Sequence, residues 1–154
     1  MMPSEHCIAL IKEFEGLATT AYVCPAGVLT IGYGHTKGVQ KGDKITEKAA
    51  TNLLRNDLKA LSIHLVKSLN ADEIEVTQDQ FDALCSFAFN VGMTALVRST
   101  LWSLLKQNKY KQAADEFLKW NKGTVDGKKI ELKGLTRRRE AERKLFLNAI
   151  SWDE

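Results

Sequence analysis

Three residue types that can take part in bond cleavage lie close together near the N-terminus: an acid, a thiol and a hydroxyl. Glu15 is followed after eight residues by Cys24, and Cys24 is followed after five residues by Thr30. Glu15 directly precedes Gly16, at the expected end of a helix, where the negative end of the helix macrodipole disfavours a charged carboxylate. A carboxyl group that holds its proton near neutral pH suits a general acid. Taken alone, such a glutamate is more often a solvated residue at a helix end.

A glycine-rich segment follows these residues. Residues 30–35 read Thr-Ile-Gly-Tyr-Gly-His, and glycines on both sides of an aromatic ring allow backbone and ligand to approach closely. His35 by itself is more often a structural histidine than a catalyst. Together with Cys24 it would permit a different chemistry, in which a thiolate attacks and the imidazole acts as base. No orienting Asp or Asn is obvious for that pair, and a cysteine in a strand is usually a small core residue.

Composition bounds the class of protein. The 154 residues are 44% apolar and 27% charged, which is typical of one soluble globular domain with a sizeable core. The longest apolar runs are a few residues, so we expect no membrane insertion, and the N-terminus shows no leader peptide. Cys7, Cys24 and Cys85 are odd in number and lack a CxxC spacing, which argues against a disulfide framework and a zinc cluster. We therefore expect free thiols, a reducing compartment, no metal and no cofactor.

Charge is unevenly distributed along the chain. The formal net charge is +3, whereas the segment from Lys133 to Lys144 alone carries six cations against Glu140 and Glu142. Such a segment suits an anionic polymer, either nucleic acid or bacterial wall, and it equally suits a solvated helix face. No recognised nucleic-acid-binding module accompanies it, so a nucleic-acid partner is not expected.

Helical spacing dominates the pattern of apolar residues. Ser4 can cap a first helix that ends at Gly16, Thr46 can cap a long helix, and Thr77 with Gln80 has the spacing of a capping box. Further helices are expected near residues 99–107, 110–121 and 136–148. Residues 17–36 are instead β-branched, aromatic and glycine-rich, with Pro25-Ala26-Gly27 as a turn between two short strands, and residues 126–127 suggest a smaller hairpin. The predicted fold is α+β: a small N-terminal β lobe, one long connecting helix and a larger helical lobe, with a substrate cleft between the lobes.

In combination, these motifs closely resemble the phage-type lysozyme (endolysin) family of wall-cleaving glycosidases. That family shows Glu, eight residues, Asp or sometimes Cys, five residues and Thr, leading into a glycine-rich turn, as Glu15, Cys24 and Thr30 do here. Other blocks match the family in order: Phe81–Gly92, Ser99–Leu101, Ala113–Phe117 and Gly134–Arg143. The resemblance extends over nearly the whole chain, from about Ser4 to Leu147.

The resemblance implies a lysozyme-like fold and a peptidoglycan hydrolase activity. Residues 1–154 would form a single lysozyme domain, with residues 15–45 as the β lobe and residues 46–154 with 4–14 as the helical lobe. The enzyme would cleave the β-1,4 bond between N-acetylmuramic acid and N-acetylglucosamine, with inversion expected. Glu15 would be the general acid, and Thr30 would hold the attacking water with help from Cys24.

Substrate-binding positions also follow from the resemblance. Arg137 matches a basic position near the acid, where it would pair with Glu15 or contact the substrate. Phe89 and Asn90 would border the cleft, and His35 resembles a structural histidine of that region. The protein would act as a monomer made in the host cytoplasm, and it would reach the wall with the help of a holin-type protein.

Cys24 is the departure from the common pattern, because many relatives carry Asp there. A carboxylate can accept a proton from water, which a neutral thiol does poorly. Two alternatives therefore remain: a Cys-dependent wall amidase or peptidase, and a catalytically silent wall-binding module. Retention of both Glu15 and Thr30 argues against the silent module.

Overall fold

A computed structural model describes residues 1–148 of the chain. The helices are α1 (Glu5–Glu15), α2 (Glu47–Ala71), α3 (Gln78–Val91), α4 (Met93–Val97), α5 (Thr100–Lys106), α6 (Tyr110–Glu116), η1 (Phe117–Lys119, a 3-10 turn) and α7 (Lys133–Leu147). The strands are β1 (Ala18–Val23), β2 (Leu29–Gly32), β3 (Lys122–Val125) and β4 (Lys128–Glu131). The predicted α+β organisation is confirmed.

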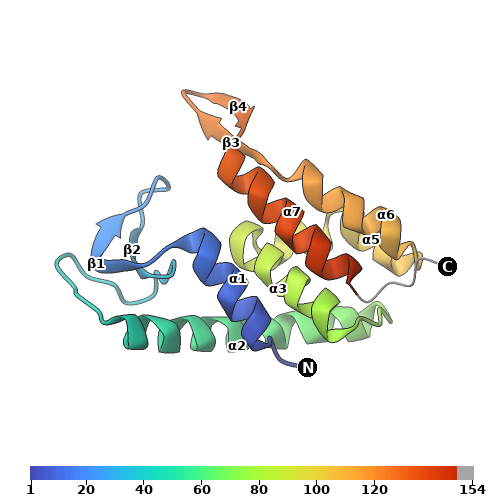
Figure 1. The fold of residues 1–154 in the computed structure, drawn as a ribbon, viewed down its shortest axis with the longest axis horizontal. Helices are drawn as coiled ribbons and strands as arrows, with labels where there is room; N and C mark the ends of the chain where they lie inside the picture. Colours follow the sequence, from blue (N-terminus) through green and yellow to red (C-terminus); the bar gives the residue numbers. More distant parts are fainter. Residues whose placement is uncertain (149–154) are drawn as a thin grey trace.

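Helix α3 is the centre of the helical part. Its residues from Gln80 to Ala88 are all buried, since α1, α2, α4 and α7 pack around it. A helix that is buried on all sides carries apolar residues around its whole circumference rather than on one stripe. Figure 1 shows α2 running along one side of the molecule, from the β1–β2 hairpin to the far end of the helical part. None of the helices in residues 1–148 combines the length and apolarity needed to cross a membrane.

The predicted helix ends are confirmed where a capping side chain marks them. Ser4, Thr46 and Thr77 each accept a backbone N–H of the first turn, and the capping box at Thr77 is complete. The ends without such a signal differ from expectation. Helix α6 stops at Glu116, because the following residues form η1 and then pair as β3, and α7 begins at Lys133 with no side-chain cap. The short helix α4, which follows Gly92, was not predicted.

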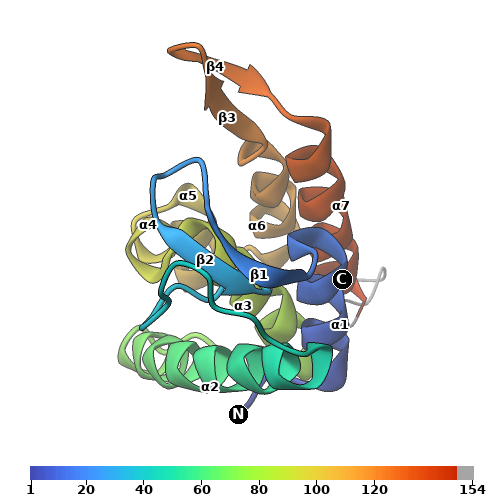
Figure 2. The ribbon, with the colours of Figure 1, turned by 90° about the vertical axis from the view of Figure 1, so that its left-hand side faces the viewer.

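Both predicted hairpins are present. Strands β1 and β2 are antiparallel, with Tyr22 opposite Thr30, and the turn between them includes Pro25-Ala26-Gly27. Strands β3 and β4 are joined by Asp126 and Gly127, whose φ angles of 51° and 78° are those that a two-residue type I′ turn requires. Figure 2 shows the β3–β4 hairpin extending beyond the helices, on the side where the β1–β2 turn lies.

One buried carboxylate attaches the start of α1 to α3. Asp82 is fully buried and accepts hydrogen bonds from the backbone N–H of Ser4 at 2.9 Å, from the Ser4 hydroxyl, and from Gln78 at 2.9 Å. Ser4 thus caps α1 and also fixes α1 against the central helix. This contact fixes the start of α1 on α3, and thereby helps to position Glu15 at the other end of the helix.

We expect Asp82→Ala to lower the free energy of unfolding by about 1–3 kcal/mol, because the partly buried N–H and hydroxyl of Ser4 lose their acceptor. Urea denaturation measures the change. Asp115→Ala is the matched control: Asp115 is 63% exposed and pairs with Arg143 at 2.9 Å, so its loss should cost less than about 1 kcal/mol. Equal effects of the two substitutions would contradict the anchoring role of Asp82.

Candidate active site

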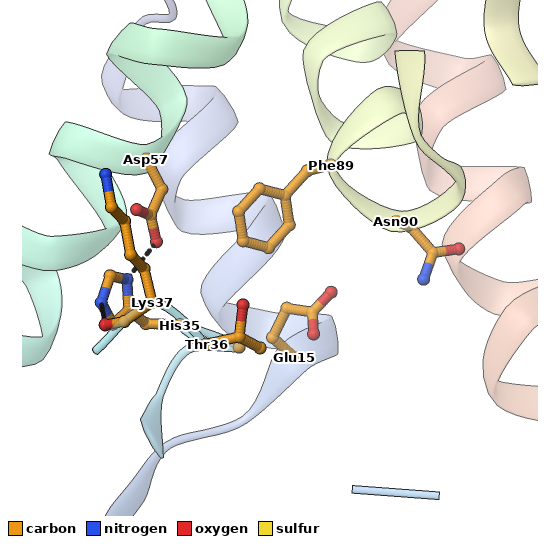
Figure 3. Close-up of a pocket in the computed structure, with 8 residues that line it drawn as sticks. Glu15, His35, Thr36, Lys37, Asp57, Phe89 and Asn90 are labelled. Atoms are coloured by element: carbon orange, nitrogen blue, oxygen red, sulfur yellow. Dashed lines mark hydrogen bonds and ion pairs between the residues drawn. The ribbon is translucent and has the colours of Figure 1, made fainter. Parts of the chain in front are cut away.

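Glu15 is the last residue of α1, and its side chain faces a pocket of about 310 Å³. The helix ends there because Gly16 takes a φ of 71°, a conformation that side chains with a Cβ disfavour. The pocket is lined by Glu15, Gly34, His35, Thr36, Lys37, Asp57, Phe89 and Asn90. Figure 3 shows Glu15 and Asn90 on one side of this group and His35 with Asp57 on the other. The pocket thus combines residues of α1, α2, α3 and the segment after β2.

Gly34 makes the close approach of the β2 segment to Glu15 possible. Its φ is 87°, and a Cβ at this position would lie 3.2 Å from Glu15 Oε1 and 3.7 Å from the Phe89 ring. A side chain here would therefore be strained in its backbone and crowded against the carboxyl group. The glycine-rich motif of residues 30–35 therefore allows the protein backbone itself, and not only a ligand, to lie next to Glu15.

Arg138, not Arg137, pairs with Glu15. The Arg138 guanidinium donates from Nη1 to Glu15 Oε2 at 2.5 Å, whereas Arg137 is exposed and lies over the Phe14 ring at 5.9 Å. Pairing with Glu15, one of the two roles predicted for Arg137, is thus wrong by one residue, whereas contact of Arg137 with a substrate stays a prediction. Three consecutive arginines lie about 100° apart on a helix, so their sequence alone does not say which one faces inward.

The buried side of α7 holds a charged network behind this ion pair. Arg138, Arg139 and Glu142 are at most 3% exposed. Glu142 accepts from Ser86 at 2.6 Å, from Arg138 at 3.3 Å and from Arg139. Burial raises the pKa of Glu142 above its ordinary value, against the opposing effect of the two guanidiniums, and burial lowers the pKa of Arg139. Two of the six cations in the basic segment therefore point inward and do not form part of an exposed basic face.

Asn90 connects this network to the pocket. Its Oδ1 accepts a hydrogen bond from Arg139, whose guanidinium also donates to the Trp120 carbonyl at 2.9 Å and lies over the Phe87 ring at 4.8 Å. Phe89 and Asn90, both predicted to border the cleft, are among the pocket residues. Their contact with a substrate stays a prediction.

His35 is held on both ring nitrogens. Nδ1 lies 2.8 Å from Asp57 Oδ2, and Nε2 lies 2.8 Å from the Lys37 carbonyl. Within residues 1–148 the imidazole makes no hydrogen bond to Cys24, so the Cys–His pair of a thiol hydrolase is not formed. Asp57 carried no signal in the sequence, because a polar residue on the exposed side of a long helix is ordinary.

Cys24 and Thr30 lie together in the β1–β2 hairpin, outside the set of residues that line the pocket. The Thr30 hydroxyl, 4% exposed, donates to the Val28 carbonyl at 3.0 Å. The nearby Val28 backbone and Thr30 side chain lower the pKa of the Cys24 thiol from its ordinary value. Cys7 and Cys85, by contrast, are fully buried in the core, and contact with Cys7 together with burial raises the pKa of Cys85. Among residues 1–148 no group of three His, Cys, Asp or Glu side chains is placed to hold a metal ion.

Comparison with known proteins decides the family. The Phage lysozyme family profile matches residues 12–142, which include Glu15, the glycine-rich turn and the charged network of α7. The chain belongs to the phage lysozyme family. An endolysin of Acyrthosiphon pisum secondary endosymbiont phage 1 is 44% identical over 146 residues, or 95% of this chain and 98% of the relative. An endolysin of Bacillus phage B103 is 48% identical over 151 residues, which are 96% of this chain and 55% of the longer relative.

Solved structures agree with this lysozyme fold. The muramidase domain of SpmX from Asticaccaulis excentricus is 36% identical with a TM-score of 0.84, covering 95% of this chain and 97% of that one. The expected lysozyme-like fold and the family resemblance are confirmed. As a phage lysozyme, the protein is a peptidoglycan hydrolase of the glycoside hydrolase type.

In this phage lysozyme, Gly34→Ala should lower activity about tenfold or more, because the added methyl group displaces the Glu15 carboxyl group. It should also cost about 1–2 kcal/mol in unfolding free energy. Gly42→Ala is the matched control, since Gly42 has a φ of 90° and open space around it. Turbidity clearing and urea denaturation measure both quantities. If Gly42→Ala lost as much activity per folded molecule, the Glu15 contact would not be the cause.

Proposed function

We propose that the protein is a lysozyme that cleaves the β-1,4 bond between N-acetylmuramic acid and N-acetylglucosamine, with Glu15 as the general acid. The observation that carries the proposal is the asymmetric environment of the Glu15 carboxyl group. Oε2 accepts the hydrogen bond from Arg138, whereas Oε1 has no hydrogen-bond partner within residues 1–148 and faces Gly34 at the pocket. One oxygen is therefore held while the other is available to deliver a proton to the leaving sugar oxygen.

We further propose inversion, with the attacking water held near Thr30 and Cys24. An inverting glycosidase needs an acid on one side of the scissile bond and a base with a water on the other. The Val28 backbone and the Thr30 side chain beside the Cys24 thiol lower its pKa, which favours the thiolate. It can then orient a water and accept its proton, a task that Asp performs in many relatives.

Attraction to the anionic wall would come from cations that remain exposed. The β3–β4 hairpin and the start of α7 carry exposed cations that form no ion pair within residues 1–148: Lys122, Lys128, Lys129, Lys133 and Arg137. They support binding to a polymer with negative charge better than the inward-facing Arg138 and Arg139 do. The proposal includes synthesis in the host cytoplasm, action as a monomer and passage to the wall with a holin-type protein.

Glu15→Gln should reduce lysis by about two to four orders of magnitude, because an amide occupies the same space but has no proton to give to the leaving group. Release of reducing ends from purified sacculi measures the loss. Glu13→Gln, on the exposed side of the same helix, is the control and should retain parental activity. A folded Glu15→Gln variant that clears sacculi at the parental rate would rule out Glu15 as the general acid and indicate a different catalytic mechanism.

Cys24 distinguishes the water-activating role from a nucleophilic one. If the residue activates water, Cys24→Asp should retain or raise activity, because a carboxylate accepts a proton more readily near neutral pH, and Cys24→Ala should lose much of it. The double variant Cys7→Ser/Cys85→Ser should remain active, so that inactivation by a thiol-alkylating reagent can be assigned to Cys24.

The configuration of the fresh product decides between these roles. Activation of water gives the inverted anomer, whereas attack by the thiolate gives a thioglycoside and then the retained anomer. NMR of the reducing end before mutarotation should show mainly the α product. A mainly β product would contradict inversion, and a fully active Cys24→Ala would show that position 24 has no chemical part.

A further inference from the structure

Glu142 is a buried carboxylate that the proposed reaction does not use directly. It is fully buried on α7 and does not line the pocket. Its Oε2 accepts from the Ser86 hydroxyl at 2.6 Å and from Arg138 Nε at 3.3 Å, and its Oε1 accepts from Arg139. All of these partners can donate, and the guanidinium groups cannot accept, so the geometry fits a carboxylate. A charge buried this deeply calls for a role that an apolar residue could not fill.

We propose that Glu142 is a positioning residue for the general acid: it orients the Arg138 guanidinium and offsets one of the two positive charges beside Glu15. The inference rests on the proposed role of Glu15 as the acid. Glu142 touches neither the pocket nor Glu15, so it would act through Arg138 and Arg139.

The orienting effect follows from the plane of the guanidinium. Arg138 uses Nε on Glu142 and Nη2 on the Ser86 carbonyl at 3.0 Å, which leaves Nη1 for Glu15 at 2.5 Å. Acceptors for three different nitrogens fix the orientation of a planar group, whereas a lysine ammonium would rotate freely. Glu142 and Ser86 therefore determine where the Glu15 carboxyl group is held.

The charge effect follows from the number of ions behind Glu15. Arg138 contacts Glu15 directly, and Arg139 also interacts electrostatically with it. With Glu142 ionised, the three buried groups together present one net positive charge to Glu15. Without Glu142 they would present two, which would favour the ionised form of Glu15 and deprive it of the proton that a general acid must give.

The test is the pH dependence of kcat/KM for release of reducing ends from soluble peptidoglycan fragments. Glu142→Gln should move the alkaline limb of this pH profile to lower pH by about one unit, because the positive charges of Arg138 and Arg139 are then both uncompensated. Arg139→Gln should move the limb to higher pH, because Glu142 then compensates Arg138 fully. The other ionisable groups of the pocket, His35, Lys37 and Asp57, are unchanged in both variants.

Ser86→Ala is the control. It removes a hydrogen bond to the same carboxylate without changing charge, so it should lower the melting temperature and leave the alkaline limb in place. A purely structural role of Glu142 would give all three variants reduced stability and an unmoved limb, and that result would overturn the inference. If Glu142→Gln does not fold, Arg139→Gln decides alone, and a limb that stays or moves down overturns it.

The result is separable from the proposed function. If Glu15→Gln is inactive and the alkaline limbs of Glu142→Gln and Arg139→Gln do not move, only the role of Glu142 is rejected. An active Glu15→Gln variant would reject the general acid itself, whatever the limbs do.

Discussion

Glu15 at the end of α1 and Arg138 on α7 meet beside the central helix, and this contact joins parts of the chain that are 123 residues apart. Because α1 leads directly into the β1–β2 hairpin, the ion pair also fixes where the strand-containing part begins. The segment after β2 approaches the same carboxyl group at Gly34. The pocket exists because these three segments converge on one glutamate.

Burying the Glu15–Arg138 ion pair has an energetic cost, and further hydrogen bonds to Arg138 offset this cost. Arg138 is almost completely buried, and burying an ion without partners costs several kcal/mol. The Ser86 carbonyl and Glu142 accept hydrogen bonds from its other two nitrogens, and Glu142 in turn holds Arg139. Arg139 then reaches Asn90 at the pocket. A surface ion pair at the same position would be screened by water and would hold Glu15 less firmly.

Local signals predicted much of this arrangement. Caps at Ser4, Thr46 and Thr77, and the turn at residues 126–127, depend on neighbouring residues alone, so their positions were found correctly. Gly16 likewise marks the end of α1, so Glu15 was correctly predicted to lie at the end of a helix. The general position of the acid could therefore be read without knowledge of its neighbours.

The features that could not be predicted from the sequence depend on contacts between distant parts of the chain. Which of three consecutive arginines faces Glu15 depends on how α7 rotates against α3, and the sequence contains no local signal for that rotation. Asp57 acquires its place only because α2 passes His35. The early end of α6 reflects formation of η1 and the pairing of β3 with β4 rather than helix propensity.

Mass spectrometry of the fragments released from purified sacculi tests the central claim most directly, because it identifies the bond that breaks. A lysozyme with Glu15 as general acid should release muropeptides that end in a reducing N-acetylmuramic acid. New free amines without new reducing ends would instead show cleavage of the peptide part. Anhydro ends would show that the sugar's own hydroxyl, rather than water, attacks, and either result would contradict the account.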